Sequence, residues 1–341
     1  MPHTHIPDLP WAEQRSPTGR FHSYFRNVSL ALGGSRNAGP SSGGHPFDLQ
    51  VRRLPPGASV CPFHLHLGQW ELFLVQSGTA TVRAGDKSYA VRAGHIFIHP
   101  PGEPHQITNS GTTDLEVLIV ADNPALDACY YPDSNKWALR PPWHVFRMQE
   151  VDYFDGEEPP ANDPTAYHPP PPTPLTVATP FEKRLRHIDE VPFESWESPK
   201  KNFHGTSKEL SIALGAVRNA PTGLGGHPFD VELNKFAPGK AGCPFHSHAA
   251  QWELFLIASG TASIRTAVAT QTFGPGDAIL QPPGKPHQIR NGSTSEDLLF
   301  YIIADNPPID YWHYPDSKKW GLREPRKFFP EPGIGYWDGE D

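Results

Sequence analysis

The feature that most constrains this chain is a histidine-rich motif that occurs twice. Residues 64–71 read HLHLGQWE, and residues 246–253 read HSHAAQWE. Two histidines one residue apart on an extended strand point to the same side, because side chains alternate between the two faces with a period of two. Two imidazoles and a nearby carboxylate provide most of a divalent-metal site. A further histidine follows in each copy, at His105 and His287.

The repeat extends over nearly the whole chain. An offset of 182 residues carries the segment GHPFD at residues 44–48 onto residues 226–230. One residue is inserted after Asn291, so that ADNP at residues 121–124 returns at residues 304–307. A period this long indicates duplicated domains rather than a solenoid. We expect an N-terminal domain at residues 5–158 and a C-terminal domain at residues 187–341.

Residues 159–186 join the two expected domains and are rich in proline, with four consecutive prolines at 169–172. Proline favours the extended polyproline conformation and lacks a backbone donor. We therefore expect a semi-rigid, exposed spacer here, in preference to a proline-rich ligand for a partner domain.

The composition favours short strands over helices. The chain of 341 residues contains 41 prolines and 30 glycines, which are typical of turns. The only helical periodicity is weak and lies in the C-terminal part of each repeat. Many short, evenly spaced strands indicate an antiparallel barrel or jelly roll, so the expected fold class is all-β. In the first copy the expected strands cover residues 51–54, 71–76, 80–83, 88–92, 96–99 and 116–120.

The strand after each motif is apolar on both faces. In residues 71–75 (ELFLV), one face carries the glutamate with Phe73 and Val75, and two leucines occupy the other. A sheet with one solvent-exposed face should alternate apolar with polar residues. We expect the outer face to be covered by the other domain or by a second copy of the chain.

The charge and the cysteine count exclude several classes of protein. The formal charge of −8 argues against a nucleic-acid-binding protein, which would carry a basic face. No apolar run approaches the roughly 20 residues that span a membrane. Three cysteines are too few for a disulfide framework. The first residues lack the basic and apolar regions of a signal peptide, so we expect a cytoplasmic location.

At these residues the sequence resembles the cupin superfamily, and specifically a bicupin. The first cupin motif contains a glycine, His-x-His and Glu, and the second contains a glycine, Pro-x-Gly, His and Asn. Both copies match both motifs, with one residue more than the usual spacer before the first histidine. The matching positions are Gly57, His64, His66, Glu71, Gly78, Gly94, Pro100, Gly102, His105 and Asn109 in the first copy, and Gly239, His246, His248, Glu253, Gly276, Pro282, Gly284, His287 and Asn291 in the second.

The resemblance implies two tandem jelly-roll β-barrels, each with a three-His, one-Glu metal site at its core. It implies one divalent transition metal per domain, from among Fe, Mn, Ni, Cu, Co and Zn, and the ligand types do not select one of them. Coordination positions would stay open for water, substrate or dioxygen. The ligating glutamates could also act as general bases. The implied ligands are His64, His66, Glu71 and His105 in the first domain, and His246, His248, Glu253 and His287 in the second; Glu71 and Glu253 are the candidate catalytic residues.

For several other repeated residues, both a structural and a functional role are considered. The thiols of Cys61 and Cys243 lie three residues before the first ligand, and we expect ordinary buried cysteines. For Gln69 the two hypotheses, a hydrogen bond to a ligand and a bond to turn backbone, are left open. His99 corresponds to Gln281 and would distinguish the two sites if it faced the cavity. The histidines of the GHPFD segments, His45 and His227, are expected to be structural.

Three classes of function fit these residues. The leading hypothesis is a metal-dependent dioxygenase for a small organic substrate, by fold-level analogy with quercetinase-like cupins. The second is an isomerase, epimerase, lyase or decarboxylase that uses the metal as a Lewis acid. Oxalate decarboxylase is the bicupin precedent, although its acidic lid motif is not found in this sequence. The third is a non-catalytic small-molecule-binding module. The internal duplication leaves both a monomer and a homodimer open.

Overall fold

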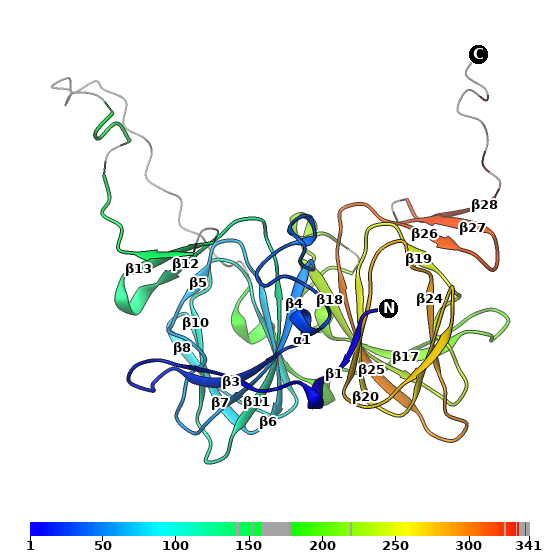
Figure 1. The fold of residues 1–341 in the computed structure, drawn as a ribbon, viewed down its shortest axis with the longest axis horizontal. Helices are drawn as coiled ribbons and strands as arrows, with labels where there is room; N and C mark the ends of the chain where they lie inside the picture. The colour runs from blue at the N-terminus through cyan, green and yellow to red at the C-terminus, as the bar shows by residue number, and fades with distance from the viewer. Residues whose placement is uncertain are drawn as a thin grey trace.

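The chain folds into two β-barrels that lie side by side (Figure 1). The computed structural model describes residues 1–140, 143–151, 153–157, 177, 179–218, 220–323, 325–331, 333 and 338. The expected all-β fold class is confirmed, since strands dominate and the α-helices, α1 (Val28–Ala31) and α2 (Leu210–Ala213), have four residues each. None of the helices in these described ranges has the length and apolar character needed to cross a membrane.

The N-terminal barrel consists of one large antiparallel sheet and two smaller ones. The large sheet has the order β15-β9-β6-β11-β4-β3-β2, and the others have the orders β10-β7-β8 and β14-β13-β12-β5. The strands are β2 (Ala12–Arg15), β3 (His22–Asn27), β4 (Phe47–Leu54), β5 (Leu65–His66), β6 (Glu71–Ser77), β7 (Thr79–Ala84), β8 (Lys87–Arg92), β9 (His95–His99), β10 (His105–Asn109), β11 (Leu115–Asp122), β12 (Asp127–Tyr131), β13 (Lys136–Arg140), β14 (His144–Phe146) and β15 (Leu185–His187).

The C-terminal barrel repeats this arrangement. Its large sheet has the order β1-β23-β20-β25-β18-β17-β16, and its smaller sheets have the orders β22-β21-β24 and β19-β26-β27-β28. The strands are β1 (His3–His5), β16 (Glu194–Glu197), β17 (His204–Glu209), β18 (Phe229–Phe236), β19 (Ser247–His248), β20 (Glu253–Ser259), β21 (Ala262–Thr266), β22 (Thr270–Phe273), β23 (Asp277–Gln281), β24 (His287–Asn291), β25 (Leu298–Asp305), β26 (Tyr311–Tyr314), β27 (Lys319–Leu322) and β28 (Lys327–Pro330).

The 3₁₀ helices lie in the connections between these strands. They are η1 (Ile6–Asp8), η2 (Pro40–Ser42), η3 (Pro132–Ser134), η4 (Phe181–Lys183), η5 (Ile188–Glu190) and η6 (Thr222–Leu224). The weak helical period expected in the C-terminal part of each repeat is wrong. Strands β12 to β14 and β26 to β28 occupy these segments, because aromatic and aliphatic residues there pair across strands and do not form a helical stripe.

The two barrels exchange one strand each. β1, at the start of the chain, pairs with β23 of the C-terminal barrel, and β15 pairs with β9 of the N-terminal barrel. The exposed spacer expected at residues 159–186 is therefore wrong at its described end, because Phe181 and Arg184 are buried in the N-terminal barrel. Residues 159–176 and 178 lie outside the described part of the chain, and the domain boundaries stay predictions.

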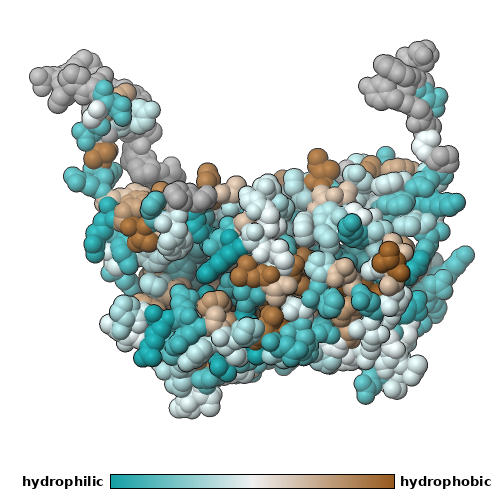
Figure 2. All heavy atoms as spheres, viewed as in Figure 1, coloured by the Kyte–Doolittle hydropathy of each residue, from teal (hydrophilic) through white to brown (hydrophobic). Residues whose placement is uncertain are grey.

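The outer faces of the large sheets bury each other. One apolar cluster contains Leu72 and Leu74 from the first barrel together with Leu254 and Leu256 from the second. This confirms that the doubly apolar strands β6 and β20 are covered, and it shows that the other domain covers them. On the face drawn in Figure 2, hydrophobic side chains occur in small groups among hydrophilic ones. The main apolar faces thus lie inside the barrels and between them.

Candidate metal centres

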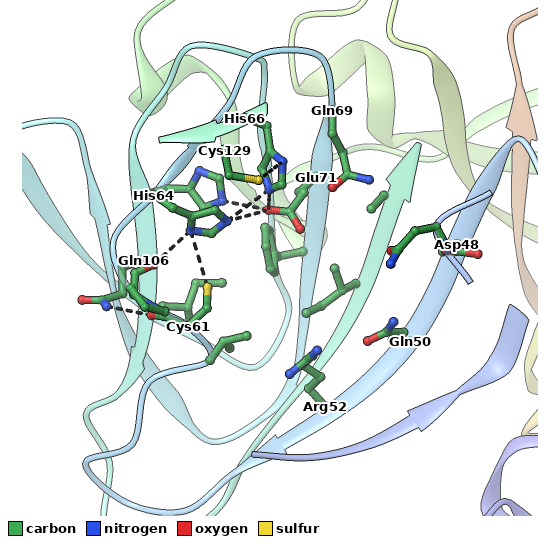
Figure 3. A pocket seen from close by; sticks show the side chains of 18 of the residues that line it. Asp48, Gln50, Arg52, Cys61, His64, His66, Gln69, Glu71, Gln106 and Cys129 are labelled. Carbon is green, nitrogen blue, oxygen red and sulfur yellow. Dashed lines mark hydrogen bonds and ion pairs between the residues drawn. The ribbon is translucent and has the colours of Figure 1, made fainter. Parts of the chain in front are cut away.

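In the N-terminal barrel, Figure 3 shows the side chains of His64, His66 and Glu71 pointing toward one centre, and His105 contacts Glu71 there. His64 lies just before β5, His66 ends β5, Glu71 begins β6, and His105 begins β10. His64 Nε2 is 3.1 Å from His66 Nε2, and His105 Nε2 is 2.9 Å from Glu71 Oε2. The same carboxylate oxygen is 3.8 Å from His64 Nε2 and 3.6 Å from His66 Nε2. The structure thus brings together all four residues that the sequence predicts.

The other nitrogen of each ring fixes its orientation. His64 Nδ1 lies 3.0 Å from the carbonyl oxygen of Pro62, and His105 Nδ1 lies 3.0 Å from that of Glu103. His66 Nδ1 lies 2.6 Å from Asp127 Oδ2. Because these oxygens can only accept, each Nδ1 carries a hydrogen, and the lone pair of each neutral ring is on Nε2, the atom that faces the centre.

This donor set fits a divalent cation. Two nitrogen lone pairs that face each other at 3.1 Å repel unless a proton or a cation lies between them. Cis ligands about 2.1 Å from one metal, at right angles, would be about 3.0 Å apart. Metal-bound histidines commonly donate their second N–H to a carboxylate or a carbonyl, as all three rings do here. The donor types and their orientation therefore match a transition-metal site.

The C-terminal barrel repeats the arrangement nearly atom for atom. His246 Nε2 is 3.2 Å from His248 Nε2, and His287 Nε2 is 2.7 Å from Glu253 Oε2. The backing oxygens are equivalent, because His248 Nδ1 lies 2.7 Å from Asp310 Oδ2. Both domains thus contain a candidate metal-binding group of histidines and a glutamate.

The charges at the first centre depend on one another. Burial favours the neutral form of His66, but the carboxylates of Glu71 and Asp127 outweigh it and raise its pKa to about 9. Burial likewise favours a protonated Glu71, and the three histidines outweigh it, so its pKa lies well below the usual range. The pKa of Glu253 is lowered in the same way. Both carboxylates are therefore ionised at neutral pH, as metal ligands need to be.

Sequence reasoning missed Asp127 and Asp310. Asp127 accepts a hydrogen bond from His66 Nδ1 and one from the backbone N–H of Gly68 at 2.9 Å, and Arg140 Nη2 lies 3.2 Å away. These contacts lower its pKa to about 2 against the effect of burial. The only signal in the sequence was that both repeats keep an aspartate at this position.

The structure shows the contacts of Gln69 and of the repeated histidines in the GHPFD segments. Gln69 Nε2 donates to the backbone oxygen of Asp122 at 2.6 Å and Gln69 Oε1 accepts from Arg140 Nη2 at 3.0 Å, so the side chain ties the turn. Trp70 packs against His227 with ring centroids 5.2 Å apart, across the domain interface. In the reciprocal contact His45 packs against Trp252 at 5.4 Å. The histidines of the GHPFD segments are thus interface residues, which is a structural role, although the sequence did not predict the interface.

The side chain of Cys61, beside the first centre, is partly buried. Cys61 Sγ lies 3.5 Å from His64 Nδ1, the nitrogen that faces away from the centre. Burial raises the pKa of Cys61 to about 12, so the reactive thiolate is scarce at neutral pH. This agrees with the expectation of an ordinary, unreactive cysteine, but the side chain is only partly buried.

The first centre opens into a cavity of about 290 Å³. Figure 3 shows Gln50 and Arg52, from β4, across the cavity from the histidine cluster. Arg52 Nη1 donates to Gln14 Oε1 at 3.1 Å and to Ser23 Oγ at 2.9 Å. Neither Arg52 nor Arg36, which also lines the cavity, forms an ion pair within the described ranges. The cavity therefore offers positive charge to a ligand.

The corresponding wall in the second domain differs in charge. In β18, Glu232 stands where β4 has Gln50, and Asn234 stands where it has Arg52. The counterpart of Arg36 is Arg218, whose Nη1 pairs with Glu209 at 3.2 Å. Burial, together with the nearby Glu209, raises the pKa of Glu232 to about 7. The two donor sets are thus alike, and the walls that face a ligand are not.

His99 does not line the cavity. Its ring lies behind His105, with the centroids 4.0 Å apart and the planes 5° apart. The difference between His99 and Gln281 therefore changes the residue behind a metal-ligating histidine and does not change the cavity wall.

Comparison with known proteins agrees with this architecture. The Cupin domain family matches residues 50–121 and 233–304, one match in each barrel. The chain is a bicupin, with one cupin domain in each half.

Two similar proteins are matched by sequence and two similar solved structures are matched by fold. An oxalate-binding protein of Thermotoga maritima is 38% identical over 68 residues, which are 20% of this chain and 55% of that protein. Auxin-binding protein T85 of Nicotiana tabacum is 24% identical over 154 residues, 42% of this chain and 76% of that protein. Among solved structures, oxalate decarboxylase OxdC of Bacillus subtilis (R92A mutant) is 19% identical, with a TM-score of 0.52, over 90% of this chain and 78% of that one. An oxalate decarboxylase of Lactobacillus farciminis is 16% identical, with a TM-score of 0.53, over 90% and 87%.

Proposed function

We propose that this bicupin is a metal-dependent enzyme that acts on a small carboxylic acid at its N-terminal centre, without net oxidation by dioxygen. The observation that carries the proposal is the pairing of the four-donor centre with a cavity that contains Arg52. The similarity to an oxalate-binding protein and to oxalate decarboxylases supports a small dicarboxylate as the substrate, and oxalate is the first substrate to test. The dioxygenase of the leading sequence hypothesis becomes the alternative, because the similar bicupin structures are decarboxylases.

The first centre is proposed to hold the metal through His64, His66, Glu71 and His105, and the second through His246, His248, Glu253 and His287. A bound divalent metal supplies Lewis acidity, which polarises a carbonyl or carboxylate oxygen. A general-base role for Glu71 or Glu253 is the weaker assignment, since the surrounding histidines keep both carboxylates weakly basic.

Arg52 is proposed to bind and orient the acid. Its Nη1 is held by Gln14 and Ser23, and its Nε and Nη2 form no hydrogen bond within the described residues. A guanidinium with free donors recognises a carboxylate through charge-assisted hydrogen bonds. Gln50 lies next to Arg52 in Figure 3, and the lining of the cavity also includes the apolar side chains of Phe73 and Ile107. A small anion would therefore lie between the guanidinium and the four donors.

The test is an assay of the metal-loaded protein with oxalate, with and without dioxygen. Decarboxylation converts hydrogen oxalate to carbon dioxide and formate without consuming an external oxidant. The His64→Ala variant should lose turnover, and His246→Ala should keep turnover at the first centre. Dioxygen uptake that matches substrate loss would instead establish the dioxygenase.

Arg52→Gln and Arg53→Gln form a matched pair for substrate binding. Arg53 lies next to Arg52 in the same strand, but its Nε faces Asp114, 3.7 Å away. Loss of a charged hydrogen bond costs about 1.5–3 kcal/mol, so KM should rise about 10- to 100-fold in Arg52→Gln. KM should be unchanged in Arg53→Gln. Equal KM values in the two variants would contradict the role of Arg52.

Binding without turnover is the second candidate function, favoured by the similarity to an oxalate-binding protein. Calorimetric titration of the metal-loaded protein with oxalate would show saturable binding in that case, while carbon dioxide and formate stayed at background.

A further inference from the structure

The segment that opens the second half of the chain lies against the back of the first centre. η4 (Phe181–Lys183) leads directly into β15, which pairs with β9 of the N-terminal barrel. Phe181 is 4% exposed and Arg184 is 3% exposed. Both residues therefore belong to the core of the N-terminal barrel, although in the sequence they precede the C-terminal domain.

Three aromatic rings form a parallel stack behind the centre. The ring of His105, a proposed ligand, lies 4.0 Å from that of His99, with the planes 5° apart. On its other side His99 lies 5.0 Å from Phe181, with the planes 3° apart. Because the stack is buried, His105 can tilt only if His99 and Phe181 also move.

Glu103 connects the same segment to the ligand by hydrogen bonds. Its carboxylate accepts from His99 Nδ1 at 2.6 Å and from both terminal nitrogens of Arg184, with Nη1 at 2.9 Å. Its backbone oxygen accepts from His105 Nδ1 at 3.0 Å. Arg184 Nη1 also donates to the backbone oxygen of Ile98 at 2.5 Å. Arg184 thus anchors the loop that orients the ligand.

The residues behind the second centre differ from those behind the first. Gln281 and Lys285 stand at the positions of His99 and Glu103. The reciprocal strand β1 brings Pro2 to the position of Arg184, and Gln281 Nε2 lies 2.8 Å from Met1 Sδ. The ring contacts of His287 are with Phe255 at 5.7 Å and with His246 at 4.8 Å. The stack with its arginine anchor therefore belongs to the first centre.

We propose that Phe181 and Arg184 are positioning residues for the first metal centre, and that they act on His105 through His99 and Glu103. The metal affinity of the first centre then depends on the docking of a segment from the other half of the chain. This inference rests on the proposed ligand assignment. Loss of a partner that orients a metal ligand typically lowers metal affinity 10- to 100-fold.

The test uses Mn²⁺ alone, with the unbound ion quantified by electron paramagnetic resonance. Full-length His246→Ala is the parent that reports the first centre, and His64→Ala is the parent that reports the second. Arg184→Gln, Phe181→Leu and His99→Gln are added to each parent. The last change installs the residue that the second centre has naturally. Arg186→Gln is the control in the same strand, because among the described residues Arg186 donates to the nearby backbone oxygens of Glu182 and Leu185 and not to Glu103.

The expected result is a 10- to 100-fold weaker Mn²⁺ affinity at the first centre in all three variants, with the second centre and the Arg186→Gln control unchanged. Unchanged affinity at the first centre would overturn the inference while leaving the ligand assignment intact. Equal losses at both centres would also overturn it, as would a His246→Ala parent that binds no Mn²⁺, which would overturn the ligand assignment as well. If Arg184→Gln does not fold, Phe181→Leu and His99→Gln decide.

Discussion

Asp127 gives the sharpest prediction about the first centre, because one carboxylate fixes the proton position of a ligand. In Asp127→Asn, the amide oxygen can still accept from Gly68 N–H, which is 2.9 Å from Oδ1. The amide NH₂ then faces His66 Nδ1 at the position of Oδ2, 2.6 Å away. Two donors cannot share that contact, so His66 should move its hydrogen to Nε2, the atom that faces the centre.

The size of the effect follows from the lost bond. A hydrogen bond to a charged group contributes about 1.5–3 kcal/mol, which corresponds to about a 10- to 100-fold loss of metal affinity. The assay is competition for Co²⁺ between a chromophoric chelator and the protein in the His246→Ala background. Asp133→Asn is the control, since Asp133 pairs with Arg83 at the surface. Affinity within twofold of the parent in Asp127→Asn would refute the proposed tautomer control.

Three further predictions concern protons and the domain interface. Because the pKa of His66 is raised to about 9, a metal ion must displace the proton of this ring. Metal affinity at the first centre should therefore rise about tenfold per pH unit from pH 6 to 8 in a potentiometric titration. A metal affinity that does not change with pH would contradict this. Burial raises the pKa of Asp122 to about 7, so its contribution to stability is present at low pH and is lost as pH rises through 7. Asp122→Asn should flatten that decline in denaturant unfolding, and an unchanged slope would count against it. Phe47 is 1% exposed at the interface, and its ring centroid lies 6.1 Å from that of Phe229. The Phe47→Ala variant should lose about 3–5 kcal/mol of unfolding free energy. A loss below 1 kcal/mol would show that the interface is not tightly packed.

The sequence predicted the donor sets because a metal site demands fixed residue types at fixed spacing. His66 lies in β5, His64 lies two residues earlier just before this strand, and Glu71 opens the next strand, so the local geometry largely determines their convergence. Asp127 could not be found in the same way, since a single aspartate at the start of a strand has no local pattern. Only the register of the repeat could have singled it out.

The strand exchange was also beyond local patterns. The sequence places residues 185 and 186 in the proline-rich spacer, and nothing local indicates that they join the edge of a sheet in the first barrel. Arg52 was overlooked for a related reason, because its meaning comes from the comparison with Asn234 at the same register of the other barrel. Differences between aligned copies of a duplication are therefore the signal to examine when the motifs themselves are identical.

Metal content per chain tests the central claim most directly. The protein would be purified without added metal, reloaded with Mn²⁺, and compared with His64→Ala and His246→Ala by elemental analysis. Two equivalent donor sets predict two ions per wild-type chain and one in each variant. A wild-type chain that binds no ion, or variants that retain both, would contradict the assignment of the two centres.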